Sequence, residues 1–274
     1  MIKVDNNLWW QPDYGFFGID FYIKGDCSKN GFSRTNPLTL SQRTKREVEF
    51  ILKHLKPKKN SLILDCPCGY GRHLIELAKK GFRVTGIDIN KPFLELGIKT
   101  AAKHNLNSHA SFLEMNMLNM NFEDNTFDYA INMFTSFGFF DKDSENEKVL
   151  INFHRTLKDE GKLLLYFDYN PTRIINHKYF NGDENKERKC IFNSTPYRLW
   201  IEEEYDKESK RLSGTWTLRN GGDPITKGYS IRIYSNEELK QLLTSVGFKL
   251  VQFYDPCNNS FTNDSKETII VATK

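Results

Sequence analysis

Apolar and polar positions alternate along the chain in blocks that predict strands followed by helices. Short apolar runs, bounded by polar residues or glycine, are separated by stretches in which apolar residues recur with helical spacing. The expected strands are 61–65, 83–88, 110–114, 127–132 and 162–168, and the expected helices are 40–55, 72–80, 91–103 and 144–157. Such alternation indicates a parallel sheet covered by helices on both faces.

The pattern changes near Asn170, where period-two alternation replaces the helical spacing. Residues 188–234 are expected to form antiparallel strands, at 197–205, 212–219 and 229–234. Ser235 and Glu238 then fit a capping box for a helix over 236–245, like that of Thr39 and Gln42 before the first helix. Strands at 248–254 and 267–273 complete the main sheet.

Three parts follow from this order of elements. Residues 1–37 are rich in aromatic residues without a clear period, which indicates an N-terminal arm or lid. Residues 38–170 and 235–274 form the α/β core. Residues 171–234 form an antiparallel cap over the substrate site.

The unit over 63–90 places polar residues at the carboxyl ends of two strands. Asp65 ends the first strand, a tight loop with Gly69 and Gly71 follows, and Asp88 ends the second strand. Parallel sheets bind ligands at this edge. The unit therefore predicts a site for a nucleotide-like ligand.

Two classes of ligand compete for this loop. A dinucleotide site requires a third glycine so that a pyrophosphate can sit on the helix N-terminus, but Leu74 occupies that position. The pattern D-x-x-x-G-x-G suits a ligand with an uncharged sugar and an amino-acid tail, because glycine lets the backbone approach it closely. A carboxylate at Asp88 can then bind both ribose hydroxyls.

This pattern resembles the class I S-adenosylmethionine-dependent methyltransferases, from roughly Val48 to the C-terminus. The resemblance rests on D-x-x-x-G-x-G, GIDIN, the strand FDYAIN, LKDEGKLLLYF and a C-terminal GF-strand-loop-strand. Pro67 departs from it, because the family usually has glycine there. It implies an α/β fold with a Rossmann-like, seven-stranded, mostly parallel sheet and an antiparallel β cap inserted after the fifth core strand. The last strand is expected to run antiparallel between its neighbours.

The resemblance also implies which residues bind S-adenosylmethionine. The methionine end is lined by Asp65, Gly69 and Gly71, while Asp88 takes the ribose and Ile89 lies against adenine. Residues that end the next two strands complete the set, namely Asn116, Met117, Asn132 and Met133. Asn116 can accept a hydrogen bond from adenine or can serve as a turn residue.

Three further residues are cofactor candidates. Arg43 is either a solvated arginine or a partner of the methionine carboxylate. Tyr14 and Tyr22 belong to the arm, which either packs on the core or closes its aromatic rings over the sulfonium.

The acceptor site is expected at the same edge of the sheet. Asp168 is the first candidate for a catalytic base or an ammonium anchor, with a turn acid as the alternative. Glu203 interrupts an apolar face, so it pairs either with a cationic acceptor or with a base such as Arg232. The candidate substrate residues are Ser136, Phe137, Phe139, Phe140, Tyr169 and Arg232.

Composition limits the partners. The net charge of +4 is spread along the chain, which disfavours nucleic acid, and no apolar run approaches the roughly 20 residues that span a bilayer. Five cysteines at irregular spacing, without a visible signal peptide, favour the cytoplasm and do not predict a metal site. The expected function is methylation of an amine or hydroxyl of a small molecule, with amines slightly favoured. The alternatives are an RNA methyltransferase and a non-catalytic cofactor-binding module, and either a monomer or a homodimer is compatible with the sequence.

Overall fold

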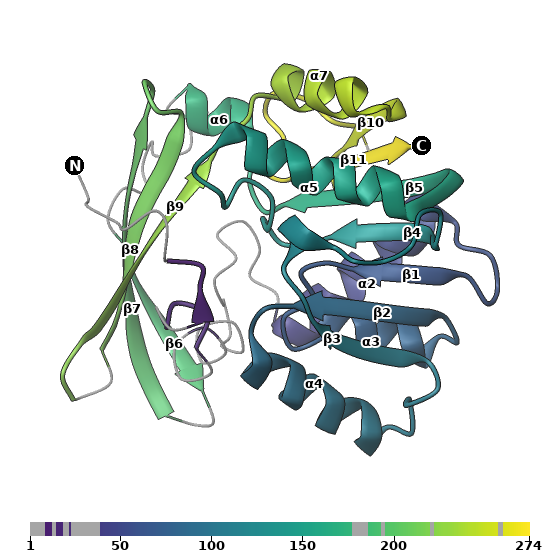
Figure 1. The fold of residues 1–274 in the computed structure, drawn as a ribbon. Helices are drawn as coiled ribbons and strands as arrows, with labels where there is room; N and C mark the ends of the chain where they lie inside the picture. Colours follow the sequence, from purple (N-terminus) through teal and green to yellow (C-terminus); the bar gives the residue numbers. More distant parts are fainter. Residues whose placement is uncertain are drawn as a thin grey trace.

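The computed structural model describes residues 9–12, 15–18, 22, 39–176, 186–192, 195–219, 222–256 and 260–274. Two sheets form its framework (Figure 1). None of the helices in these segments is both long and apolar enough to cross a bilayer.

The larger sheet has seven strands in the order β10-β11-β5-β4-β1-β2-β3. In chain order these are β1 (Leu62–Asp65), β2 (Arg83–Asp88), β3 (Ala110–Glu114), β4 (Phe127–Asn132), β5 (Leu157–Phe167), β10 (Lys249–Tyr254) and β11 (Thr268–Thr273). Only β11 runs antiparallel, and it pairs with β10 on one side and β5 on the other. The predicted Rossmann-like sheet is confirmed.

Two helical layers cover the sheet. The helices α2 (Leu40–Leu55), α3 (Arg72–Lys79) and α4 (Lys91–Lys103) contact one another in sequence, and α5 (Asp143–Thr156) packs on α7 (Asn236–Val246). Successive side chains of a strand point to opposite faces, so Ile63 packs in the core cluster under α2 and α3 whereas Leu64 packs in the cluster under α5 and α7. Both capping boxes predicted from the sequence are present, at Thr39 and Ser235.

The second sheet is antiparallel and has four strands in the order β6-β7-β8-β9. These strands are β6 (Lys186–Phe192), β7 (Thr195–Asp206), β8 (Arg211–Arg219) and β9 (Ile225–Arg232). It follows α6 (Pro171–Ile175) in the chain and stands apart from the helical layers in Figure 1. The antiparallel cap is therefore present after the fifth core strand, with β6 in addition to the three strands expected.

One boundary differs from the expectation. β5 begins at Leu157 rather than at 162, because Leu157 is buried and pairs with Phe127 of β4 before the register shifts. Glu160 has a positive φ of 62° within this stretch. A left-handed residue between two paired segments is local geometry that hydrophobic periodicity does not reveal.

Candidate active site

A cavity opens at the carboxyl ends of β1, β2 and β4, between the core sheet and the described residues of the N-terminal arm. The empty space inside it and at its open mouth amounts to about 900 Å³. Its described lining residues are Trp10, Phe17, Tyr22, Cys66, Pro67, Cys68, Gly69, Tyr70, Arg72, His73, Ile87, Asp88, Ile89, Asn90, Phe93, Met115, Asn116, Met117, Met133, Phe134, Ser136, Phe139 and Phe140. The cavity therefore joins the glycine loop to the aromatic run after β4.

Asp88 ties the end of β2 to the glycine loop. Its Oδ2 accepts a hydrogen bond from the Gly69 N–H at 2.8 Å, and its Oδ1 accepts one from the Asn90 N–H at 2.9 Å. Burial raises the pKa of this carboxyl, whereas the backbone donors oppose the rise. Each carboxylate oxygen has a further lone pair, so Asp88 can shape the loop and still accept two ribose hydroxyls.

Gly71 begins α3 and brings that helix close to the sheet. Its φ is 78°, in the left-handed region, and a Cβ there would lie 2.5 Å from the Phe112 ring. A side chain would therefore force the ring away. Gly69 lines the cavity, whereas Gly71 serves the packing behind it.

Asp65 lies at the end of β1, fully buried behind the cavity wall. Neither carboxylate oxygen has a hydrogen-bond partner of standard geometry among the described residues. Burial raises the pKa of Asp65 to about 8. The charge of Arg72 opposes this rise and the charge of Asp88 adds to it. The Leu74 N–H also lowers the pKa, although it does not meet the geometry of a hydrogen bond. The carboxyl is therefore largely protonated near neutral pH in the cofactor-free protein.

A buried group of charges supports the cavity wall beside the glycine loop. Arg72 and His73 both line the cavity, and both bind the Glu47 carboxylate from α2, His73 Nε2 at 2.8 Å. Burial alone would raise the pKa of Glu47, but Arg72 and His73 hold it well below its usual range. Burial, with the charge of Arg72, lowers the pKa of His73 to about 4. His73 is therefore neutral near pH 7 and donates its Nε2–H to Glu47.

Phe134 and Thr135 follow β4 in an unusual backbone conformation. Their φ values are 56° and 62°, which bulky and β-branched residues rarely adopt. The Thr135 N–H donates to the Tyr166 carbonyl at 2.8 Å, and the Phe134 ring lies 4.6 Å from the Arg43 guanidinium. Backbone strain of this kind is often concentrated at functional sites.

Aromatic rings close the far end of the cavity. The segment Ser136–Phe140, here called the acceptor wall because the sequence analysis predicts that it binds the acceptor, meets residues of the N-terminal arm. Trp10 packs edge-on against Phe140 with ring centroids 5.2 Å apart, and Phe17 stacks on Phe139 at 5.9 Å. The Phe17 carbonyl also accepts a hydrogen bond from Asn90 Nδ2 at 2.8 Å, which ties the arm to the cofactor side.

Comparisons with known proteins agree with this geometry. A family profile described as a methyltransferase domain matches residues 63–161. A putative methyltransferase of Geobacillus sp. (strain WCH70) is 23% identical over 218 residues, which is 77% of this chain and 83% of the relative. Residues 63–161 form a methyltransferase domain, and the protein is an S-adenosylmethionine-dependent methyltransferase.

Two solved structures share the fold of this methyltransferase. The CcbJ methyltransferase of Streptomyces caelestis superposes with a TM-score of 0.69 at 19% identity, over 83% of this chain and 93% of that one. CalS10 of Micromonospora echinaspora, an amino pentose methyltransferase with S-adenosylmethionine bound, superposes with a TM-score of 0.64 at 16% identity, over 85% and 90%. The cofactor of the methyltransferase is S-adenosylmethionine.

The residues of the cavity fit this cofactor. Asp88 offers the carboxylate that the ribose hydroxyls require, and Gly69 leaves its backbone open to the cavity. Ile89, Asn116 and Met117 line the predicted adenine end. Asn116 also fulfils the turn alternative, because its Oδ1 accepts a hydrogen bond from the Leu118 N–H at 2.9 Å. When bound, the cofactor supplies a methyl group activated by a positively charged sulfur.

Many predicted site residues of the methyltransferase line the cavity. On the cofactor side these are Tyr22, Gly69, Asp88, Ile89, Asn116, Met117 and Met133, and on the acceptor side they are Ser136, Phe139 and Phe140. Tyr14 lies outside the described residues. The individual roles assigned to these residues remain predictions.

Other predicted cofactor residues are buried behind the cavity lining. Asn132 donates from its Nδ2 to the Cys66 carbonyl at 2.9 Å, so it braces the loop rather than facing the ligand. Arg43 is not a solvated arginine, because only 1% of its surface is exposed. It lies behind Phe134, and Arg72 takes the cavity position beside it.

The predicted catalytic carboxylates do not line the described cavity. The Asp168 carboxylate accepts a hydrogen bond from the Thr135 hydroxyl at 3.1 Å, so it supports the strained turn. Glu203 lies in β7 opposite Gly214, in the cap sheet. The sequence correctly predicted that Asp168 lies at the carboxyl end of a core strand, but it did not reveal the direction of the side chain.

Three predicted substrate residues, Phe137, Tyr169 and Arg232, do not line the described cavity and make packing contacts or ion pairs instead. Phe137 is buried against Tyr234 with centroids 5.5 Å apart, and Tyr169 is buried against Phe167 at 5.4 Å. Arg232 binds Asp143 and Glu238 rather than Glu203 in the contacts described. Sequence analysis missed Trp10, Phe17, Tyr70, Arg72, His73, Phe93 and Phe134 as cavity residues. Of these, Tyr70, Arg72 and His73 carried a signal, because they lie in or directly after the glycine loop, and Trp10 and Phe17 belong to the aromatic arm that was expected to pack on the core or to close over the site.

Proposed function

We propose that this methyltransferase transfers the methyl group of S-adenosylmethionine to an amine or hydroxyl of a small molecule by in-line displacement. The observation that supports this is the continuous cavity from Asp88 to the aromatic acceptor wall. Rings from the arm close over the far end, which suits an acceptor that enters the cavity whole.

The chemistry of the acceptor side favours an amine within this proposal. Ser136 lines the cavity, and its hydroxyl donates to the Met133 carbonyl at 2.8 Å, so its oxygen remains able to accept a hydrogen bond. The described part of the acceptor wall contains no carboxylate or histidine. A hydroxyl acceptor needs a base to remove its proton, whereas a neutral amine is already nucleophilic.

Positioning then carries the catalysis. An amine accepting a hydrogen bond would lose the lone pair needed for attack, so the Ser136 oxygen suits an amine N–H as the donor. With the cofactor bound, the rings of Phe139 and Phe140 would exclude water from this end of the cavity and limit the orientations that an acceptor can take. CalS10, an amino pentose methyltransferase of the same fold, is compatible with an amine-bearing acceptor here.

Matched acceptor pairs test the proposal. The purified protein is incubated with methyl-labelled S-adenosylmethionine and with amino sugars, aromatic amines and the hydroxyl analogue of each, and products are identified by mass spectrometry. We expect methylated amines, at a rate that rises with pH as the amine loses its proton. Methylation of hydroxyl members alone would refute the amine preference, and label found only in added RNA would refute a small-molecule acceptor.

A further inference from the structure

The acceptor wall is held in place by the cap. The Arg232 N–H of β9 donates to the Gly138 carbonyl at 2.8 Å. Gly138 has a φ of 100°, and a Cβ there would lie 2.5 Å from the Arg232 carbonyl oxygen. The wall and the cap backbone are therefore in direct contact at this point.

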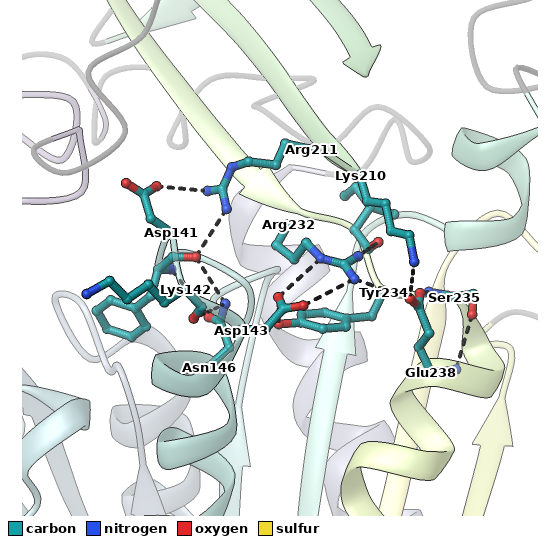
Figure 2. Close-up of polar contacts among 12 residues, drawn as sticks. Asp141, Lys142, Asp143, Asn146, Lys210, Arg211, Arg232, Tyr234, Ser235 and Glu238 are labelled. Atoms are coloured by element: carbon teal, nitrogen blue, oxygen red, sulfur yellow. Dashed lines mark hydrogen bonds and ion pairs between the residues drawn. The ribbon is translucent and has the colours of Figure 1, made fainter. Parts of the chain in front are cut away.

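Arg211 of β8 makes the second contact, through its side chain. It is 7% exposed, and its Nη1 donates to the Phe140 carbonyl at 3.1 Å. Its other donors bind Ser230, with Nε reaching the hydroxyl at 2.8 Å and Nη2 the carbonyl at 2.9 Å. Figure 2 shows Arg211 reaching from the cap toward Asp141, whose carboxylate lies 3.7 Å from Nη2.

The backbone of Phe140 is held by hydrogen bonds from two elements, β8 of the cap and α5 of the core. Asn146 of α5 donates to the same carbonyl at 3.0 Å, and its Oδ1 accepts a hydrogen bond from the Phe140 N–H at 3.3 Å. The ring of Phe140 lines the cavity and packs on Trp10 of the arm. The backbone that carries this ring is thus held by one core residue and one cap residue.

Arg232 provides a contrast on the neighbouring strand. It is equally buried, but its side chain binds Asp143 at 3.2 Å and Glu238 at 3.2 Å, and it lies over the Tyr234 ring (Figure 2). None of these three partners lines the described cavity. The two arginines therefore share burial, charge and strand position in the cap, but only Arg211 contacts the cavity wall through its side chain.

We propose that Arg211 is a positioning residue for the acceptor, holding Phe140 against the N-terminal arm and so setting which acceptors fit. The proposal rests on the proposed function for its catalytic consequence. The cofactor side is built from the loop over 65–71, the end of β2 and the residues after β3, which Arg211 does not touch in the contacts described. Loss of Arg211 should therefore affect the acceptor and leave the cofactor in place.

The test compares Arg211→Met, Arg211→Lys and the matched control Arg232→Met. Hydrogen exchange of the backbone amides is followed by mass spectrometry over 136–142, the affinity for S-adenosylhomocysteine is measured by calorimetry, and KM is measured for the best acceptor found. For Arg211→Met we expect at least tenfold faster exchange at Phe140 and about tenfold higher acceptor KM, with cofactor affinity changed less than twofold. Lysine can still donate to the Phe140 carbonyl, so Arg211→Lys should recover most of the wild-type values. Arg232→Met should lower stability without changing either readout.

Unchanged exchange at Phe140 in Arg211→Met, or equal acceleration in Arg232→Met, would overturn the proposal. Faster exchange with an unchanged acceptor KM would also overturn it, because the wall would then be loose without consequence for binding. If Arg211→Met does not fold, the same comparison is decided with Arg211→Lys, which should show a smaller change in the same direction. Failure to find any acceptor would count against the proposed function, whereas the exchange data would still decide whether Arg211 holds the wall.

Discussion

Replacement of the buried Asp65 by asparagine gives a quantitative test of the electrostatics behind the cofactor cavity. Burial raises the pKa of Asp65 to about 8, whereas an aspartate in an unfolded chain titrates near pH 4. Below pH 4 the group is protonated in both states. Between about pH 4 and pH 8 the unfolded chain releases its proton and the folded protein retains it. This carboxyl therefore reduces stability progressively as pH rises through that window, and its effect is constant above it.

The size of the effect follows from the shift. Each unit of pKa difference corresponds to about 1.4 kcal/mol, so Asp65 destabilises the cofactor-free protein by about 4 kcal/mol at pH 7 relative to pH 4. An asparagine side chain at this position does not ionise between pH 4 and pH 8. Any cost of packing the amide shifts the free energy of unfolding by an amount that does not depend on pH.

Urea unfolding of the cofactor-free wild type and Asp65→Asn, at pH 5, 6, 7 and 8, separates the two contributions. The stability of the variant minus that of the wild type should grow by about 1.4 kcal/mol for each pH unit up to pH 7, and by less between pH 7 and pH 8, where Asp65 itself ionises in the folded protein. Titration of groups that do not interact with Asp65 is common to both proteins and cancels in the difference. A difference that stays constant across this range would show that Asp65 ionises normally in the folded protein, and the reasoning would be refuted.

Three other substitutions probe the site. Asp88→Asn should weaken binding of S-adenosylhomocysteine about 10- to 150-fold in calorimetry, since charged hydrogen bonds contribute about 1.5–3 kcal/mol; an unchanged affinity would remove Asp88 from the ribose site. Glu47→Gln should destabilise the protein by about 3–5 kcal/mol at pH 7 in urea unfolding, because it removes the carboxylate charge that compensates the buried Arg72. Because folding lowers the pKa of Glu47, its contribution to stability is complete above pH 4.5 and is lost as the pH falls toward the folded-state pKa. The free energies of unfolding of the wild type and Glu47→Gln should therefore converge in acid. Gly71→Ala should cost about 1–3 kcal/mol more than Gly81→Ala in urea unfolding, because both residues have a positive φ but only Gly71 meets the Phe112 ring; equal losses would exclude that clash.

The fold and the cofactor side were largely predictable because their signals are local. The alternation of strands and helices, the two capping boxes and the residues at the ends of β2 and β4 each depend on a few neighbouring positions. Strand ends in a parallel sheet lie at one edge, so Asp88 and Met133 could be placed in one cavity from the sequence alone.

The buried charges of α2 were not predicted: Arg43 was expected either to be solvated or to bind the methionine carboxylate, and Glu47 was not identified, because charged residues are mostly exposed. Arg43 and Glu47 are one turn apart and continue the face of Val48 and Ile51 toward the helix N-terminus. Burial of Glu47 is compensated by Arg72 and His73, which both come from a different helix. Such a partner is fixed by tertiary packing, which helical periodicity does not report.

The acceptor side was less predictable for a related reason. Asp168 follows β5 at the expected edge, but its side chain turns to Thr135 instead of the cavity. The arm contributes Trp10 and Phe17 to the lining, although its sequence has no period that assigns a face. Side-chain direction at a strand end and the docking of an irregular segment both depend on contacts remote in sequence.

The position of β11 has a consequence for how the chain folds. All six residues of this strand are buried, and it pairs with β5, so that Tyr166 and Glu267, 101 residues apart, form a hydrogen bond. Closing an unstructured loop of that length costs about 4 kcal/mol in chain entropy. Because the cap lies within the loop, a cap that folds first shortens the disordered chain left to be closed. Formation of the small sheet should therefore speed closure of the large one, and cap substitutions far from the cavity should slow refolding of the core.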